Sequence, residues 1–230
     1  MRPRCVAVVG PTATGKSALG LAIAHRYGGE IVNCDSTAVY RGFDIGTDKV
    51  PPASQQGIPH HLVDIVEPTD DYTAARYAQD AAAVIRRIRS RGRLPIVVGG
   101  TGLYYRALTR GLFPGPPADP ALRARLERVA DRRGNQWLHR LLTRRDPESA
   151  ARIAVADRKR MIRAIEVLLL TGRPLTAHFA ETVAPLPEFE VFAVALRMPL
   201  DALTPRLSER VDAQLAAGLE AEVRGLLAAG

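Results

Sequence analysis

The most constraining feature of the chain is an octet near its start, Gly10-Pro11-Thr12-Ala13-Thr14-Gly15-Lys16-Ser17. It fits the pattern G-x-x-x-x-G-K-[ST], and it lies between the apolar run 5–9 and the helix-like segment 18–24. In a strand–loop–helix unit, the glycines let successive backbone N–H groups point inward, and the lysine reaches the outer phosphates. The octet therefore predicts a phosphate-binding loop over residues 10–17, in which Ser17 offers its hydroxyl to Mg2+.

Composition sets the limits for the rest of the chain. Its 230 residues, 47% of them hydrophobic, suffice for one α/β domain with an insertion. No stretch approaches the roughly 18 apolar residues of a membrane span, and no signal peptide is evident, so we expect a cytoplasmic protein that does not bind membranes. Cys5 and Cys34 lie in apolar runs and are expected to be buried thiols. The 32 basic and 24 acidic residues give a charge of +8, which favours a polyanionic partner.

The pattern along the chain predicts a P-loop NTPase-like α/β fold, a parallel sheet flanked by helices with a small helical insertion domain. Apolar runs indicate strands at 5–9, 30–34, 94–98 and 189–196, and helices alternate with the early strands. A Pro/Gly cluster at 114–117 precedes an Arg-rich helical stretch without strand signals. We therefore assign residues 1–115 to the first part of the core, 116–156 to the insertion, and 157–230 to the return to the core.

Asp35 is the carboxylate that distinguishes this chain from an ordinary P-loop ATPase. Such an ATPase places an Asp for its Mg2+ shell at the end of a long apolar strand, whereas the strand at 94–98 leads into Gly99-Gly100-Thr101. Asp35 instead follows the strand at 30–34, at the sheet edge where ligands bind. It is either a base or acceptor that faces the phosphate loop, or the cap of a turn.

Several motifs in order resemble those of the tRNA dimethylallyltransferases, also called tRNA isopentenyltransferases. They are Asp35-Ser36 with Tyr40, Asp44-Ile45-Gly46-Thr47 with Lys49, Pro59-His60-His61-Leu62-Val63-Asp64, Val98-Gly99-Gly100-Thr101-Gly102-Leu103-Tyr104, Asp157-Arg158-Lys159-Arg160, Arg163-Ala164-Ile165-Glu166 and Thr171-Gly172-Arg173-Pro174. The resemblance covers essentially the whole chain.

The resemblance implies a prenyl transfer at the phosphate loop. Dimethylallyl diphosphate would bind there, and its five-carbon group would pass to the exocyclic amine of the adenine 3′ to the anticodon of tRNA. By resemblance, Asp35 accepts the amine proton, and Thr101 belongs to the catalytic set with Lys16. Lys16, Ser17, Mg2+ and the loop amides would stabilise the departing diphosphate. Arg210 would add a second cationic contact, although a solvated helix arginine is the alternative.

The acceptor adenine lies in an anticodon loop, so it must leave its stack to react. The resemblance assigns the contacts with the tRNA anticodon stem-loop to Asp35, Ser36, Thr37, Ala38, Thr101, Arg123, Lys159, Arg160, Met161, Ile162 and Arg163, and makes the insertion tRNA-facing. For the arginines, solvated surface positions are the alternative, because the chain has many of them.

The chain departs from the family by ending earlier than its members usually do, so we expect a C-terminal truncation. Two other classes stay open on the residues alone. One is a P-loop small-molecule or nucleoside kinase that binds ATP, and the other is a catalytically impaired RNA-binding fragment. We expect a monomer, because no coiled-coil pattern occurs.

Overall fold

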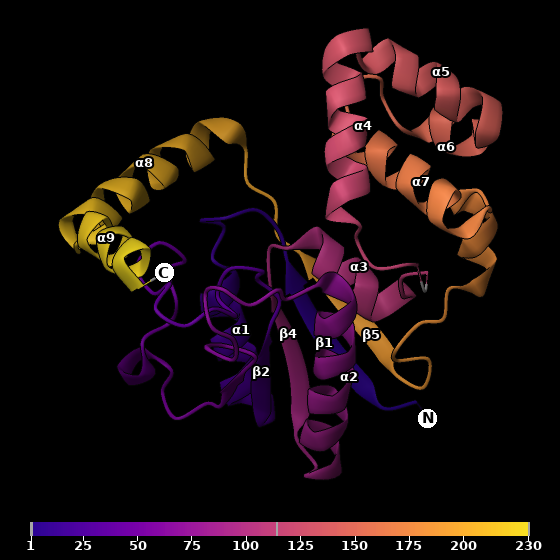
Figure 1. The fold of residues 1–230 in the computed structure, drawn as a ribbon. Helices are drawn as coiled ribbons and strands as arrows, with labels where there is room; N and C mark the ends of the chain where they lie inside the picture. The colour runs from indigo at the N-terminus through magenta and orange to yellow at the C-terminus, as the bar shows by residue number, and fades with distance from the viewer. Residues whose placement is uncertain (1, 114, 230) are drawn as a thin grey trace. The chain divides into compact units, whose positions relative to one another are not determined.

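The computed structural model describes residues 2–113 and 115–229, which fall into two compact units. A sheet unit lies within Met1–Gly111 and Ala184–Gly230, and a helical unit lies within Leu112–Val183 (Figure 1). The helical unit is therefore inserted in sequence between two segments of the sheet unit. Over the described ranges, no helix combines the length and the apolar character that a membrane crossing needs.

The sheet unit is built on parallel strands. In the described residues, the sheet has five strands in the order β3-β2-β4-β1-β5. They are β1 (Arg4–Val9), β2 (Gly29–Asn33), β3 (His60–His61), β4 (Leu94–Gly99) and β5 (Glu190–Ala195). The apolar runs predict four of them. The short β3 was not expected, because two histidines carry no apolar strand signal, and it pairs with Ile31 and Val32 of β2. The predicted parallel α/β fold is confirmed.

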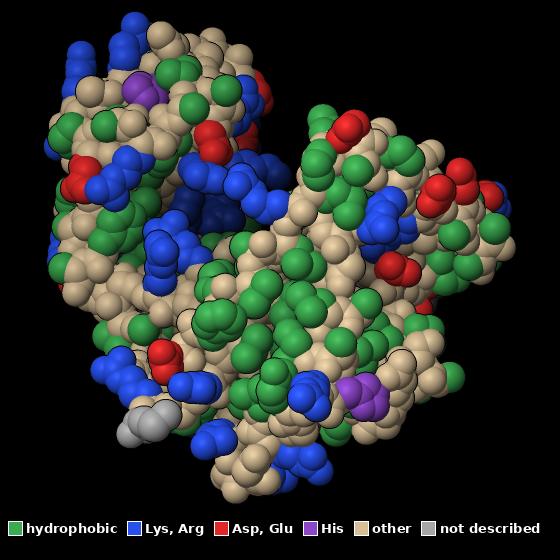
Figure 2. Space-filling model, turned by 180° about the vertical axis from the view of Figure 1, so that it is seen from behind, with side chains coloured by type: hydrophobic (Ala, Val, Ile, Leu, Met, Phe, Trp, Pro, Cys, Tyr) green, Lys and Arg blue, Asp and Glu red, His purple; other side chains and the backbone are tan. Residues whose placement is uncertain are grey.

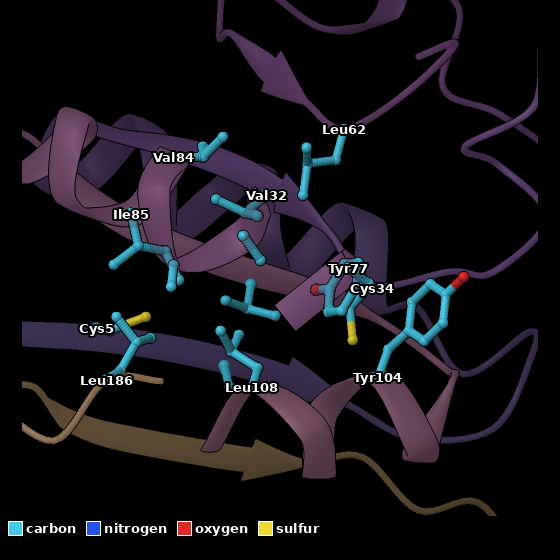
Figure 3. Close-up of a cluster of buried hydrophobic side chains, with 14 of the residues drawn as sticks. Cys5, Val32, Cys34, Leu62, Tyr77, Val84, Ile85, Tyr104, Leu108 and Leu186 are labelled. Atoms are coloured by element: carbon cyan, nitrogen blue, oxygen red, sulfur yellow. The ribbon is translucent and has the colours of Figure 1, made fainter. Parts of the chain in front are cut away.

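Helices cover both faces of this sheet. They are α1 (Lys16–Tyr27) on one face, and α2 (Ala74–Ser90) with α3 (Gly102–Arg110) on the other. The sheet unit also contains α8 (Leu200–Ala216), α9 (Leu219–Ala229) and the short 3-10 helix η1 (Pro52–Ser54). Adjacent strand residues point to opposite faces. Ala7, Val32 and Val97 pack with α2 and α3 (Figure 3), whereas Val8, Ile31 and Ile96 pack with α1. Cys5 and Cys34 are both buried free thiols, as expected.

The carboxyl ends of β2 and β4 approach each other unusually closely. A Cβ built on Gly99 would lie 2.2 Å from the carbonyl carbon of Cys34. Two backbone hydrogen bonds connect the two segments here. The N–H of Cys34 donates to the carbonyl of Val98 (2.8 Å), and the N–H of Thr101 donates to the carbonyl of Cys34 (3.1 Å). Residue 99 must therefore be glycine for the two segments to meet.

Gly99→Ala is expected to destabilise the sheet unit by about 1–3 kcal/mol, because backbone atoms must move to admit the methyl group. Urea denaturation followed by circular dichroism measures the change. Gly102→Ala is the matched control, because a Cβ at Gly102 meets nothing within 4 Å. Equal stability of the two variants would contradict this account of the junction.

The helical unit has its own core and a different boundary from the one expected. It contains α4 (Pro120–Arg133), α5 (Asn135–Arg145), α6 (Pro147–Arg152), α7 (Arg158–Thr171) and the 3-10 helix η2 (Leu175–Glu181). We expected the chain to return to the core at residue 157. Instead, Met161 and Ile165 of α7 pack with Leu126, Leu138 and Leu142, so α7 belongs to the helical unit.

A buried carboxylate organises the polar side of this unit. Glu166 of α7 is fully buried, and its oxygens accept hydrogen bonds from Nε and Nη2 of Arg123 (2.9 Å each), from Arg163 (2.6 Å) and from the N–H of Asp119 (2.8 Å). Burial alone would raise the pKa of Glu166, but these donors outweigh burial and lower the pKa to about 2. The carboxylate therefore stays ionised inside the unit.

Glu166→Gln is expected to cost about 3 kcal/mol of stability at pH 7, because the arginines lose their buried partner. The folded pKa of Glu166 lies below its usual value, so its contribution is complete above about pH 4.5 and is lost as the pH falls toward 2. Denaturation at a series of pH values should show the gap between wild type and variant closing over that range.

Glu148→Gln serves as the control, because Glu148 forms an exposed pair with Arg152 in the same unit. A gap between wild type and Glu166→Gln that does not depend on pH would contradict the role of the ionised carboxylate.

Candidate phosphate-binding site

The carboxyl edge of the parallel sheet brings the predicted site segments together. The phosphate loop, residues 10–17, follows β1, Asp35 follows β2, and Thr101 follows β4. Because all strands run in one direction, these three connections share one edge, where α/β proteins place their ligands. The predicted clustering of these segments thus follows directly from the observed topology.

The phosphate loop has the backbone that its glycines permit. Gly10 has a φ of 147°, and a Cβ there would lie 2.6 Å from the carbonyl oxygen of Leu196. Gly15 has a φ of 89° and directly precedes α1. The loop therefore needs glycine at both positions, and it presents the N-terminus of α1 to the sheet edge.

Lys16 lies across this loop. Its Nζ donates a hydrogen bond to the carbonyl of Pro11 (2.6 Å). The pKa of Lys16 lies below its usual value, mainly because burial disfavours the charged form. The nearby carboxylate of Asp35 raises the pKa, and the positive charge of Arg210 lowers it. Lys16, Asp35 and Arg210 therefore act on one another electrostatically at the same edge.

Asp35 is held in a fixed turn with one oxygen turned to its own backbone. Its Oδ1 accepts hydrogen bonds from the N–H (2.9 Å) and the hydroxyl (2.6 Å) of Thr37. The buried side chain of Asn33 accepts from the N–H of Asp35 (3.0 Å) and donates to its carbonyl (3.0 Å). Within residues 2–113 and 115–229, Oδ2 of Asp35 has no hydrogen-bond partner. Asp35 therefore caps a turn through Oδ1, while its Oδ2 can accept a hydrogen bond from a ligand.

Thr101 joins the two strand ends at the site. Its Oγ1 accepts a hydrogen bond from the N–H of Ser36 (2.9 Å) and donates to the hydroxyl of Ser36 (3.2 Å). In this structure, Thr101 is therefore engaged with the backbone that carries Asp35.

Most of the side chains predicted to bind the donor line one cavity at this edge of the sheet. Among the residues of the sequence-predicted site, it is lined by Thr12, Lys16, Ser17, Asp35, Ala38 and Arg210. Arg210 comes from α8, far along the chain, and pairs with Asp48 (3.3 Å). The segment Thr47, Asp48, Lys49 and Val50 also lines the cavity. The cavity lining therefore combines three cationic side chains (Lys16, Lys49 and Arg210), two carboxylates (Asp35 and Asp48) and apolar side chains such as those of Val50 and Val98.

The remaining predicted tRNA contacts lie in the helical unit. Lys159 and Arg160 are exposed near the start of α7, and Arg123 and Arg163 hydrogen-bond Glu166. Met161 and Ile162 belong to the unit's hydrophobic core. Their side chains are therefore buried, whereas Lys159 and Arg160 of the same predicted run are exposed.

Sequence reasoning missed two residues that shape the site. Asn33 looked like an ordinary member of an apolar run, and only its burial beside Asp35 indicates its role. Lys49 belongs to a recognised motif, but no function was assigned to it. Its Nζ is nearly buried and contacts Tyr40 O (2.6 Å), Asp44 Oδ1 (2.8 Å) and Asp64 Oδ1 (2.5 Å).

His60 and His61 both contact other groups of the protein through their rings. His61 Nε2 pairs with Glu30 (2.7 Å), while His60 Nδ1 lies 2.9 Å from the carbonyl of Ile58. Across the described residues, no group of three or more His, Cys, Asp or Glu side chains is placed to hold a metal ion. A metal at this site would therefore depend on oxygen atoms from a bound phosphate chain as well as from the protein.

Comparison with known proteins gives one consistent family. The family model described as IPP transferase matches residues 38–230. The tRNA dimethylallyltransferase of Thermomicrobium roseum is 48% identical over 230 residues, which cover 100% of this chain and 69% of that protein. The protein of the same name from Halorhodospira halophila is 51% identical over 220 residues, covering 95% of this chain and 71% of the relative.

Solved structures agree with this assignment. The tRNA isopentenylpyrophosphate transferase of Bacillus halodurans superposes with a TM-score of 0.67 at 38% identity, covering 100% of this chain and 71% of that one. A eukaryotic dimethylallyltransferase acting on tRNA gives a TM-score of 0.75 at 28% identity, over 98% of this chain and 56% of the other. The phosphate loop and Asp35 lie at one edge of a parallel sheet, and the sequence matches these relatives over nearly its whole length. The chain therefore belongs to the tRNA dimethylallyltransferase family.

Proposed function

We propose that this chain transfers the dimethylallyl group of dimethylallyl diphosphate to the exocyclic amine of the adenine 3′ to the anticodon of tRNA. The observation that carries the proposal is the shared cavity of Lys16, Arg210 and Asp35. It places cations for a leaving diphosphate and a carboxylate for a departing proton around one space. A kinase can combine the same two features, because it also uses a carboxylate to accept a hydroxyl proton. Membership of the tRNA dimethylallyltransferase family is what favours prenyl transfer over a kinase reaction.

The reaction breaks one bond and forms another. The C–O bond of the allylic diphosphate breaks, and its electron pair leaves on the diphosphate oxygen. The amine nitrogen forms the new N–C bond and loses a proton. Lys16, Arg210 and the amides of the phosphate loop stabilise the charge that builds on the leaving group, and this stabilisation lowers the barrier.

Asp35 is the proposed acceptor of the amine proton. The adenine amine is a weak nucleophile, because its lone pair is delocalised into the ring, so removing its proton assists attack. Oδ1 of Asp35 is bound to Thr37, which fixes the carboxylate and leaves Oδ2 for the amine. Thr101 supports this arrangement by holding the backbone of Ser36.

The helical unit is proposed to contact the anticodon stem-loop of tRNA. Lys and Arg side chains are numerous on its surface (Figure 2), and Lys159 and Arg160 are exposed. Such side chains bind phosphates and position the RNA without reading its sequence. The adenine would leave its stack to reach Asp35. Ser36, Thr37 and Ala38 follow Asp35 directly and would meet the base.

Mg2+ is the proposed cofactor. Ser17 lies in the first turn of α1 and lines the cavity with Lys16. Mg2+ keeps several waters and binds through few protein groups together with substrate phosphates, so a single hydroxyl beside a phosphate loop fits it. When bound, the ion neutralises charge on the diphosphate. We further propose a monomer that acts in the cytoplasm, where two buried free thiols are usual.

Asp35→Asn is expected to lower prenyl transfer by about 100-fold or more, because the amide cannot accept the proton. Transfer is measured with labelled dimethylallyl diphosphate and unmodified tRNA. Calorimetry should show that the donor still binds, since the phosphate loop is intact.

The control for this variant is Asp71→Asn, which changes an exposed carboxylate. Full transfer by Asp35→Asn would remove Asp35 from its proposed role. If the wild type instead moved phosphate from ATP and no prenyl group to RNA, the proposed function itself would be wrong.

Ser17→Ala is expected to raise the Mg2+ concentration needed for half-maximal transfer, because the ion loses its hydroxyl ligand. The maximal rate at saturating Mg2+ should fall less than the rate at low Mg2+. Ser90→Ala, at the end of α2, is the control. An unchanged Mg2+ titration would show that Ser17 does not bind the ion.

A further inference from the structure

One segment that lines the cavity has no long regular structure. We call residues 41–50 the wall loop. It contributes Thr47, Asp48 and Lys49 to the cavity lining. A loop of this length needs ties to hold one conformation, because its backbone N–H and C=O groups are not paired in a sheet. Those ties come from two directions.

From the protein interior, Lys49 holds the loop to its own base. Its Nζ bonds the carbonyl of Tyr40 and the carboxylate of Asp44, and so closes the loop on itself. It also bonds Asp64, which follows β3. The loop is thereby attached to the edge of the sheet.

From the other side, one carboxylate of α9 gathers three consecutive backbone donors. Glu222 accepts hydrogen bonds from the N–H groups of Asp44 (2.9 Å), Ile45 (2.7 Å) and Gly46 (3.0 Å). Burial would raise the pKa of Glu222, and the nearby Asp44 would also raise it, but the three N–H groups outweigh both and lower it. The carboxylate is ionised, and its hydrogen bonds are therefore the strong, charge-assisted kind.

Further contacts show that α8 and α9 sit tightly on the wall loop. Gln214 of α8 donates to the carbonyl of Ile45 (2.9 Å). A Cβ on Gly46 would lie 3.2 Å from Leu219, and one on Gly42 would lie 3.2 Å from Leu226. In Figure 1, α9 lies beside the purple loop segment that follows β2. The two helices and the loop thus form one packed assembly.

This assembly carries Arg210. Arg210 lies on α8, lines the cavity with Lys16, and pairs with Asp48 of the wall loop. Only Ala217 and Gly218 separate α8 from α9. The position of Arg210 over the cavity therefore depends on where α8 and α9 are fixed, and Glu222 forms three of the contacts that fix them.

We propose that Glu222 is a positioning residue for donor binding, which clamps α8 and α9 onto the wall loop so that Arg210 faces the diphosphate. The inference rests on the proposed function for the identity of the donor. It assigns no contact between Glu222 and the substrate. Its effect passes through Arg210, and this separates it from a residue that merely stabilises the fold.

The test compares Glu222→Gln with wild type in two measurements. Calorimetry gives the affinity for inorganic diphosphate with Mg2+, and steady-state transfer gives the KM for dimethylallyl diphosphate and for tRNA. We expect the diphosphate affinity to fall about tenfold and the donor KM to rise similarly, as loss of a charge-assisted hydrogen bond predicts. The KM for tRNA should stay unchanged. Hydrogen exchange should show faster exchange of the amides at 44–46.

Glu220→Gln is the matched control, because Glu220 lies on the same helix and pairs only with the exposed Arg224 among the described residues. The decisive step repeats Glu222→Gln in an Arg210→Ala background. If Glu222 acts through Arg210, the second substitution has no further effect on diphosphate affinity, since coupled residues are not additive. This cycle separates positioning from general destabilisation, which would lower affinity in both backgrounds.

Two results would overturn the proposal. One is an unchanged diphosphate affinity in Glu222→Gln, and the other is an equal loss in both backgrounds. Failure of the proposed function has a different signature, because wild type would then transfer no prenyl group to tRNA. The calorimetric comparison with inorganic diphosphate would still decide the role of Glu222 in that case.

Discussion

The contact between Cys34 and Gly99 is the constraint on which the site depends. The backbone of Cys34, directly after β2, lies so close to residue 99 that a Cβ there would be 2.2 Å from the carbonyl carbon of Cys34. The hydrogen bonds of Cys34 and Thr101 extend the sheet pairing past the last strand residues. Asp35 and Thr101 are consequently fixed by backbone geometry, and the phosphate loop after β1 lies along the same edge. The chemistry of the cavity is therefore built on the sheet rather than on flexible side chains.

Much of this arrangement could be predicted because it is encoded locally. Apolar runs of five to eight residues predict strands, and the glycine pattern of residues 10–17 predicts the loop that follows the first strand. Threonine is a typical residue at the start of a helix, and the hydroxyl of Thr73, directly before α2, accepts a hydrogen bond from the N–H of Arg76 (3.2 Å). Asp35 could be singled out because it follows an apolar run, a position that predicts a sheet edge.

Other features depend on contacts between distant segments and carry no local signal. The strand β3 exists only because β2 offers it a partner. The assignment of α7 to the helical unit follows from its packing on α4 and α5, which periodicity cannot reveal. Glu222 resembles any acidic residue of a surface helix, although it binds three amides more than 170 positions away. The sequence also suggests cationic residues as the important ones, yet two carboxylates, Glu166 and Glu222, organise their surroundings.

The discontinuous sheet unit has a consequence for how the protein is made. β1 carries the phosphate loop and lies between β4 and β5 in the sheet. During synthesis, β4 emerges from the ribosome before the helical unit, whereas β5 emerges after it. At a synthesis rate of ~5–20 residues per second, the edge of β1 that pairs with β5 would stay unpaired for about ten seconds. An unpaired edge can join the wrong strand. During this stage of synthesis, β1, the strand that leads into the phosphate loop, can pair with a wrong strand.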